Sequence, residues 1–378
     1  MLTSRNYILI SVLAALLGAG AILFQWQAAN SETSYATPSV FSPLAFLLEN
    51  KPKAKPPAQT AKGLYLTAYS ASDPKKLDEI IKLIDETELN AVIIDIKDYT
   101  GYILYKSRVP LAKKNGLSRN LLPDLPGIIK KLHDKNIYVI ARQTVFQDPV
   151  LAAKKPGWAI KDKDNLVWRD HRGLSWVDPT RREVWKYNFD IAREVADFGF
   201  DEINFDYVRF PSDGDMSRVV YNMGGRAKSQ IMREFYQTLS SELANEPVWL
   251  SLDMFGLTME AKNNFDLNIG QRIVDAVSST DYISPMMYPS HYPRGHLGFQ
   301  NPAAHPGEVF AHGLKLGMPK FTGQRAKLRP WIQAFNLGAV YDAVKIRAQI
   351  DEIEKYTDAG WLMWNASNRY TSAGLLPE

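Results

Sequence analysis

Glu202-Ile203-Asn204-Phe205-Asp206-Tyr207-Val208 is the stretch of sequence that decides the fold. Polar and apolar residues alternate through it, which is the period of a β-strand whose two faces have different surroundings. Other short runs rich in β-branched and aromatic residues read as strands at 63–69, 91–97, 137–142, 248–254, 282–288, 328–334 and 360–364. Helical periodicity separates most of these runs, at 74–88, 123–135, 181–198, 226–244 and 341–357. This order predicts βα units around a parallel sheet.

Eight strands with helices between them favour an α/β fold of the (β/α)8 TIM barrel type over an open, doubly wound sheet. No glycine-rich phosphate loop follows the first strand, which also argues against a dinucleotide-binding domain. The chain has 378 residues, enough for one such barrel and a tail. Proline and glycine are frequent in 288–323, so we expect a long loop there rather than a helix.

The first 62 residues differ in composition from the rest. Arg5 precedes an uncharged apolar run over 7–24, so 1–29 reads as a signal peptide or membrane anchor. The length of the run favours an anchor, with a cleaved signal peptide as the alternative. Arg5 would hold the N-terminus in the cytoplasm and send the remainder outward, predicting a membrane-anchored extracytoplasmic or a secreted, periplasmic domain. Proline and lysine make 30–62 a flexible linker, and 63–378 is the expected barrel.

Composition excludes several classes of chemistry. The chain has no cysteine, and therefore no thiolate nucleophile and no disulfide. A net charge of +4 is small for this length and does not indicate nucleic-acid binding. The loop histidines His291, His296, His305 and His312 are irregularly spaced and no HExxH motif occurs, so we predict neither a metal nor another cofactor.

The active site of such a barrel lies at the carboxyl ends of its strands. If the apolar positions of 202–208 face the helices, Asn204 and Asp206 point into the barrel. The same alternation turns Asp253 inward on the next strand, and Asp95 and Lys97 inward on 91–97. Buried charges cost several kcal/mol each unless they are paired. Their convergence therefore favours a site, with a satisfied polar layer as the alternative.

Two carboxylates on neighbouring strands are what glycoside hydrolysis requires. Adjacent strands lie about 4.8 Å apart, close to the carboxyl separation of about 5 to 5.5 Å in retaining enzymes. We therefore predict Asp206 as the nucleophile. Asp253 would be the acid and base, its pKa raised by burial and by the neighbouring charge. Arg209 and Lys97 are expected to keep Asp206 ionised.

Further side chains near the strand ends are predicted to bind substrate. The chain has nine tryptophans, and flat aromatic faces suit sugar rings. Tyr288 and Trp364 are the best placed for stacking, although core packing is the alternative for each. The full predicted set comprises Asp95, Lys97, Arg142, Asn204, Arg209, Tyr288, Trp331 and Trp364.

The stretch Asn204-Phe205-Asp206-Tyr207-Val208-Arg209-Phe210-Pro211 resembles the fourth-strand motif of a family of exported bacterial proteins described as glycosyl hydrolases. Asp253-Met254-Phe255-Gly256 and Met286-Met287-Tyr288-Pro289 are similar to its later strand ends, and the resemblance covers about 63–370. That family is similar in barrel plan to the alpha-amylase superfamily, which implies Asp206 as nucleophile and Asp253 at the acid position. Amylase-like enzymes usually have Glu as the acid and a further Asp near the seventh strand, whereas 328–334 contains no carboxylate.

Two functions follow. The first is a retaining glycoside hydrolase that acts on a cell-envelope or extracellular polysaccharide, and the Asp206 and Asp253 pair favours it. The second is a catalytically inactive carbohydrate-binding or envelope scaffold protein, which the missing third carboxylate favours. Both predict a carbohydrate ligand and membrane association through the N-terminal segment.

Overall fold

The computed structural model describes residues 54–378. The predicted signal or anchor at 1–29, and the predicted linker as far as residue 53, lie outside the described residues. Within 54–378, no helix combines the length and the apolar character needed to cross a membrane.

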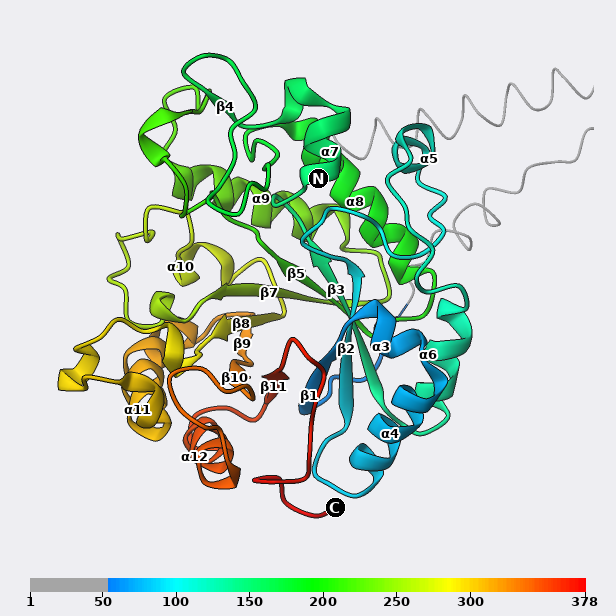
Figure 1. Cartoon of the computed structure of the whole chain (residues 1–378), viewed down its shortest axis with the longest axis vertical. Helices are drawn as coiled ribbons and strands as arrows, with labels where there is room; N and C mark the ends of the chain where they lie inside the picture. Colours follow the sequence, from blue (N-terminus) through cyan, green and yellow to red (C-terminus); the bar gives the residue numbers. More distant parts are fainter. Residues whose placement is uncertain (1–53) are drawn as a thin grey trace, which may run out of the picture. The chain divides into compact units, whose positions relative to one another are not determined.

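The described chain is a closed, eight-stranded parallel barrel surrounded by helices, as predicted (Figure 1). Each strand pairs with its neighbour in parallel, and β10 closes the ring by pairing with both β8 and β11. The seventh position is occupied by two short pieces, β9 and β10, because Pro330 lacks the N–H needed for continuous pairing. The barrel strands are β1 (Ala61–Leu66), β2 (Ala91–Lys97), β3 (Tyr138–Thr144), β5 (Glu202–Asp206), β7 (Trp249–Phe255), β8 (Tyr282–Met286), β9 (Lys327–Leu328), β10 (Trp331–Gln333) and β11 (Gly360–Trp364).

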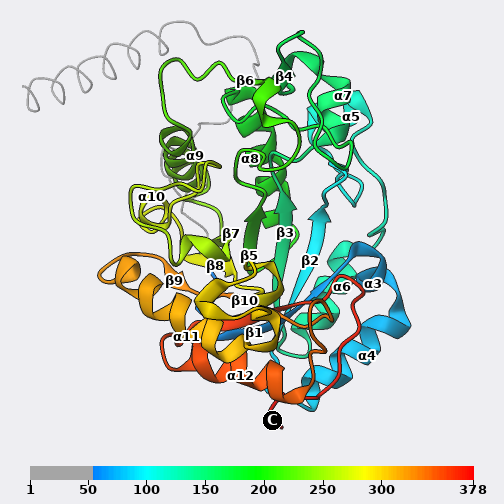
Figure 2. The ribbon, with the colours of Figure 1, turned by 60° about the vertical axis from the view of Figure 1, so that its left-hand side comes forward.

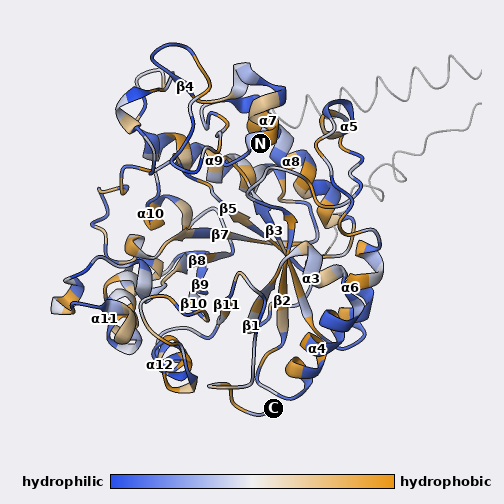
Figure 3. Cartoon of the chain, in the orientation of Figure 1, coloured by the Kyte–Doolittle hydropathy of each residue, from blue (hydrophilic) through white to orange (hydrophobic). Residues whose placement is uncertain are grey.

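The helices form a layer outside the barrel. The inner sides of α4 and α6 are apolar and face the strands, and β2 is predominantly hydrophobic (Figure 3). The helices are α3 (Ala68–Ser72), α4 (Pro74–Asp85), α5 (Pro110–Asn115), α6 (Leu125–His133), α7 (Pro149–Lys154), α8 (Arg182–Ala196), α9 (Lys228–Glu242), α10 (Ile273–Ala276), α11 (Pro306–Gly317) and α12 (Ala343–Glu354).

The prediction of a long loop without a helix over 288–323 is wrong for part of this segment. Residues Pro306–Gly317 form helix α11, which packs against α12. Pro306 occupies the first turn, where its missing N–H costs no hydrogen bond, and the glycines lie where the helix meets its neighbours. Gly313 and Gly317 each lie so close to a methionine side chain that a Cβ would overlap it. The residues that suggested a loop therefore serve the start and the packing of a helix.

Two long connecting segments, called the excursions below, follow β3 and β5 at the carboxyl ends of these strands. They are joined by a small antiparallel sheet of β4 (Lys161–Asp162) and β6 (Val219–Val220). Figure 2 shows the arrowheads of β2 and β3 pointing toward this part of the molecule. The excursions thus stand on the side of the barrel where its active site is expected.

The opposite end of the barrel, its base, is closed by a buried ion pair. Arg329 Nη1 lies 2.6 Å from Glu202 Oε2, and neither side chain is exposed. The Arg329 guanidinium also donates to the carbonyl of Ala359 and lies 3.6 Å from the ring centre of Tyr282. The described end of the predicted linker covers this region, since Pro56 accepts a hydrogen bond from Trp249 and Gln59 accepts one from Arg329.

We expect Arg329→Met to lower the free energy of unfolding by about 3 to 5 kcal/mol, because Glu202 would be left buried without its partner. Urea denaturation followed by circular dichroism measures this loss. The double variant Glu202→Gln/Arg329→Met removes both charges and should recover most of the stability. A single variant as stable as the parent protein would show that the pair does not hold the base together.

Candidate active site

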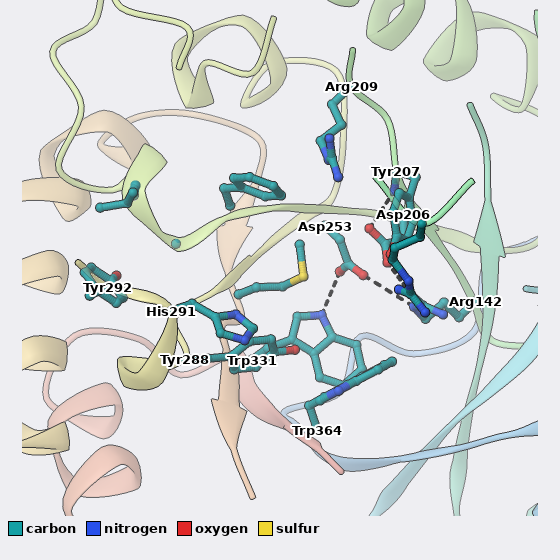
Figure 4. Close-up of a pocket in the computed structure, with 15 residues that line it drawn as sticks. Arg142, Asp206, Tyr207, Arg209, Asp253, Tyr288, His291, Tyr292, Trp331 and Trp364 are labelled. Atoms are coloured by element: carbon teal, nitrogen blue, oxygen red, sulfur yellow. Dashed lines mark hydrogen bonds and ion pairs between the residues drawn. The ribbon is translucent and has the colours of Figure 1, made fainter. Parts of the chain in front are cut away.

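A cavity of about 600 Å³ opens at the carboxyl ends of the barrel strands. It is lined from β3, β5, β7, β8, β10 and β11 and from the loops that follow them (Figure 4). The lining residues are Arg142, Arg172, Asp206, Tyr207, Arg209, Asp253, Phe255, Gly256, Leu257, Met286, Tyr288, His291, Tyr292, Trp331 and Trp364.

Arg142 on β3 is the centre of the charged group in the floor of this cavity. Its Nη1 donates to Asp95 Oδ1 at 2.6 Å, and its Nη2 forms an ion pair with Asp206. Its Nε lies 3.7 Å from Asp253 Oδ2. One guanidinium therefore touches three carboxylates that come from β2, β5 and β7.

Asp253 is held so that one of its oxygens stays available. Its Oδ1 accepts hydrogen bonds from Trp331 Nε1 at 2.7 Å and from Asn204 Nδ2 at 2.8 Å. Burial, and next the negative charge of Asp206, raise the pKa of Asp253 well above its ordinary value, against the opposing effect of Arg142. Because Oδ1 accepts two hydrogen bonds, a proton on this carboxyl belongs on Oδ2.

Asp206 is the last residue of β5, and the chain turns sharply after it. Tyr207 has φ of +54°, a left-handed conformation that is uncommon for an aromatic residue. The turn brings the Tyr207 backbone N–H to 2.5 Å from Asp206 Oδ1. Strained backbone of this kind is concentrated at functional sites. Both oxygens of Asp206 thus have donors, one of them charged.

The strands place the two carboxylates side by side. β5 and β7 pair in register, with Phe205 opposite Leu252, so that Asp206 and Asp253 follow at neighbouring positions. Figure 4 shows both carboxyl groups directed toward Arg142. The two groups share one cation but differ in environment, because Asp253 is more deeply enclosed by Trp331 and Asn204.

Aromatic rings form the other wall. Trp364 stacks on Tyr65 with ring centres 4.0 Å apart, and Trp331 meets Trp364 edge to face at 5.6 Å. The Tyr65 hydroxyl donates to Asp95 Oδ2 at 2.5 Å, which fixes the carboxylate that orients Arg142. Tyr288 is buried and packs its ring against His291. The wall is thus joined to the charged floor through Tyr65.

Most of the residues predicted to form the site are gathered here. Asp206, Asp253, Arg142, Arg209, Tyr288, Trp331 and Trp364 line the cavity. Asp95 and Asn204 are buried behind these lining residues. Asp95 accepts a hydrogen bond from Arg142, and Asn204 donates one to Asp253. A third carboxylate is therefore present, but Asp95 on β2 supplies it rather than the seventh strand.

Lys97 lies elsewhere, contrary to the alternation argument. A bulge in β2 shifts the register, so that Asp95 pairs with Arg142 whereas Lys97 pairs with Gln143. Gln143 faces helix α8, where it donates to Asn188. Lys97 consequently points to the same side and forms a fully buried ion pair with Asp148 at 2.9 Å.

The prediction that Arg209 and Lys97 are the counter-ions of Asp206 is also wrong. Neither Lys97 nor Arg209 forms an ion pair with Asp206, because Arg142 takes that position. The guanidinium of Arg209 instead donates to the Phe210 carbonyl and the Ser212 hydroxyl.

Eight lining residues lie outside the predicted site set, namely Arg172, Tyr207, Phe255, Gly256, Leu257, Met286, His291 and Tyr292. Phe255 directly follows the predicted strand 248–254, and His291 lies three residues after the end of the predicted strand 282–288, so their position along the chain was a usable signal. Arg172 belongs to the excursion after β3, which brings it over the cavity from far along the loop. No sequence pattern marks such a residue. Among residues 54–378, no group of three or more acidic, histidine or cysteine side chains is placed to hold a metal ion.

Comparison with solved structures finds similar proteins. A hypothetical protein from Ruminiclostridium thermocellum ATCC 27405 is 38% identical, with a TM-score of 0.47 over 50% of this chain and 96% of that chain. The PgaB (BpsB) glycoside hydrolase domain from Bordetella bronchiseptica is 12% identical, with a TM-score of 0.58 over 82% of this chain and 95% of that domain. At this identity the likeness shows the fold alone.

Comparison with curated proteins found no match. A family model described as "Putative glycosyl hydrolase domain" matches residues 63–370, which include β1 from its third residue, all the other barrel strands and the cavity described above. The match extends over far more than half of the 378 residues. The chain therefore belongs to this glycosyl hydrolase domain family.

Proposed function

We propose that this protein is a retaining glycoside hydrolase in which Asp206 is the nucleophile and Asp253 is the acid and base. The observation that carries the proposal is the pair of carboxylates beside Arg142 in an open cavity, in two different environments. Burial raises the pKa of Asp253, which favours its protonated form, while Asp206 is in direct contact with a guanidinium. A carboxyl group that is held protonated, beside one that contacts a cation, suits the roles of acid and nucleophile.

The reaction proceeds in two steps. In the first, an oxygen of Asp206 forms a bond to the anomeric carbon while the glycosidic carbon–oxygen bond breaks. The proton on Asp253 Oδ2 passes to the leaving oxygen. In the second, a water molecule attacks the anomeric carbon, Asp253 takes its proton, and the bond to Asp206 breaks. The sugar leaves with its original configuration.

The substrate class is the second part of the proposal. A cavity of about 600 Å³ with an aromatic wall accommodates sugar rings, which stack on flat apolar faces through their C–H groups. We infer that the substrate is a polysaccharide of the cell envelope or the extracellular space. The uncharged apolar run over 7–24, preceded by Arg5, supports an extracytoplasmic location.

Incubation of the protein with a panel of defined polysaccharides, followed by proton NMR of the first products, tests the proposal. We expect release of a sugar whose anomeric configuration matches that of the cleaved bond. A product of opposite configuration would rule out attack by Asp206 and indicate direct attack by water. Binding without hydrolysis across a broad panel would instead favour the carbohydrate-binding scaffold.

A further inference from the structure

Three arginines are buried in the described part of the chain, and two of them have carboxylate partners. Arg329 pairs with Glu202 at the base, and Arg142 contacts three carboxylates in the cavity floor. Arg209 is 8% exposed, yet no carboxylate of residues 54–378 lies within ion-pair distance of it. A buried guanidinium without a counter-ion is costly, which marks Arg209 as different from the other two.

Aromatic rings cover the guanidinium of Arg209. Its central carbon lies 4.9 Å from the ring centre of Trp176, 5.3 Å from that of Tyr207 and 4.7 Å from that of Phe255. Such contacts stabilise the cation through its planar faces and fix its orientation. They do not use the N–H groups at its edge.

Most of the edge donors have no acceptor in the described part of the chain. Nη1 donates to the Phe210 carbonyl at 3.1 Å and to Ser212 Oγ at 3.3 Å, whereas no acceptor among residues 54–378 contacts Nε or Nη2. Burial also lowers the pKa of Arg209, and the more distant negative charges of Asp206, Asp213 and Asp170 oppose this shift without cancelling it. Arg209 lines the cavity, and Figure 4 shows its guanidinium reaching toward Asp206 and Asp253 from the upper side.

A second cation lines the same cavity. Arg172 lies in the excursion after β3, with its guanidinium 5.7 Å from the ring centre of Tyr99. Asp170 fixes this part of the loop, because its Oδ1 accepts from the backbone N–H groups of Arg172 and Leu174 and its Oδ2 accepts from Trp176 Nε1. The same carboxylate thus positions Arg172 and the Trp176 ring beneath Arg209.

We propose that the part of the cavity lined by Arg172 and Arg209 is a subsite for an acidic sugar unit. The carboxylate or sulfate group of this unit accepts hydrogen bonds from Arg209, and Arg172 adds a second positive charge nearby. The inference rests on the proposed function in taking the cavity as a carbohydrate site. An oxyanion matches the forked donors of a guanidinium and supplies a negative charge in direct contact with it, which no carboxylate of residues 54–378 provides. A neutral hydroxyl satisfies a donor but supplies no counter-charge.

Binding of matched sugars, measured by ligand-observed NMR, tests the subsite without requiring turnover. The probes are glucuronic acid against glucose, galacturonic acid against galactose, N-acetylmuramic acid against N-acetylglucosamine, and N-acetylglucosamine 6-sulfate against its parent sugar. We expect the acidic member of at least one pair to bind about 10- to 100-fold more tightly, the range for hydrogen bonds to a charged group. The sulfated pair distinguishes sulfate from carboxylate recognition.

Arg209→Gln should abolish this preference, so that the acidic and neutral members of a pair bind to the variant with affinities within about twofold of each other. Arg209→Lys should retain part of it, because the charge remains but the fork is lost. The matched control is Arg182→Gln, since Arg182 also lies over a tryptophan ring but is on helix α8, outside the cavity lining. Melting temperatures of the three variants separate loss of binding from loss of folding.

The inference is overturned if no pair shows an acidic preference, whether both members bind or neither does. It is also overturned if the preference survives in Arg209→Gln. The proposed function fails separately: a protein that prefers an acidic sugar but hydrolyses nothing keeps this subsite and loses the hydrolase. A protein that cleaves only neutral glycans, at the same rate in Arg209→Gln, keeps the hydrolase and loses the subsite.

Discussion

Asp206→Asn is expected to lower kcat by at least about 1,000-fold and to leave the protein folded. The amide has nearly the same shape as the carboxyl group but cannot attack the anomeric carbon. Arg142 keeps contacts with Asp95 and Asp253, so its burial is still compensated in the variant. Hydrolysis rates, melting temperature and glycan affinity should be measured on the same preparation.

The matched control for this change is Asp134→Asn, which makes the same substitution in an exposed ion pair on the outer surface. It should retain full activity. Asp206→Ala offers a sharper readout, because external azide can occupy the vacated space and attack the anomeric carbon. Recovery of turnover, with a glycosyl azide of inverted configuration as product, is expected. Hydrolysis by Asp206→Asn at the rate of the parent protein would place the nucleophile elsewhere.

Asp253→Asn is expected to affect substrates according to their leaving groups. Polysaccharides and other substrates whose leaving oxygen needs a proton should lose about 100- to 10,000-fold in turnover. The formation of the covalent intermediate from a dinitrophenyl glycoside should be nearly unchanged, because that leaving group departs without a proton. Its hydrolysis still needs a base, so the intermediate should accumulate and be detectable by mass spectrometry of the intact protein.

The pH profile provides an independent check on Asp253. Its raised pKa means that the proton is present at low pH and is lost as the pH rises through that value. The parent protein should therefore lose kcat/KM on the alkaline side, and the Asn variant should lack that decline. An equal loss of rate for every leaving group, with the alkaline decline unchanged, would show that another group is the acid.

The barrel and the position of both carboxylates could be predicted because they depend on local periodicity. Strand alternation is a property of the backbone, so Asp206 and Asp253 both reach the cavity from polar positions of alternating runs. The same rule misplaced Lys97, because one bulged residue in β2 reverses the direction of the side chain that follows. Nothing in 91–97 distinguishes a bulged strand from a regular one.

Partnerships between distant residues were harder to predict. Arg142 was expected only to bind substrate, yet its three carboxylates come from strands that are separated by up to 158 positions along the chain (253 minus 95). Choosing among several candidate cations requires knowledge of side-chain reach, which periodicity does not give. Helix α11 was missed for a different reason. Its glycines lower local helix propensity, and packing against α12 and the methionine side chains overrides that preference.

The buried Glu202–Arg329 pair closes the end of the barrel that lies opposite the cavity. Selection for stability and selection for new specificity would therefore act on different sets of positions in the same strands. In directed evolution, substitutions that strengthen the base can be fixed first and would raise tolerance to damaging changes in the cavity. A library of variants confined to the excursions after β3 and β5 could then alter sugar preference without weakening the Glu202–Arg329 pair at the base of the barrel.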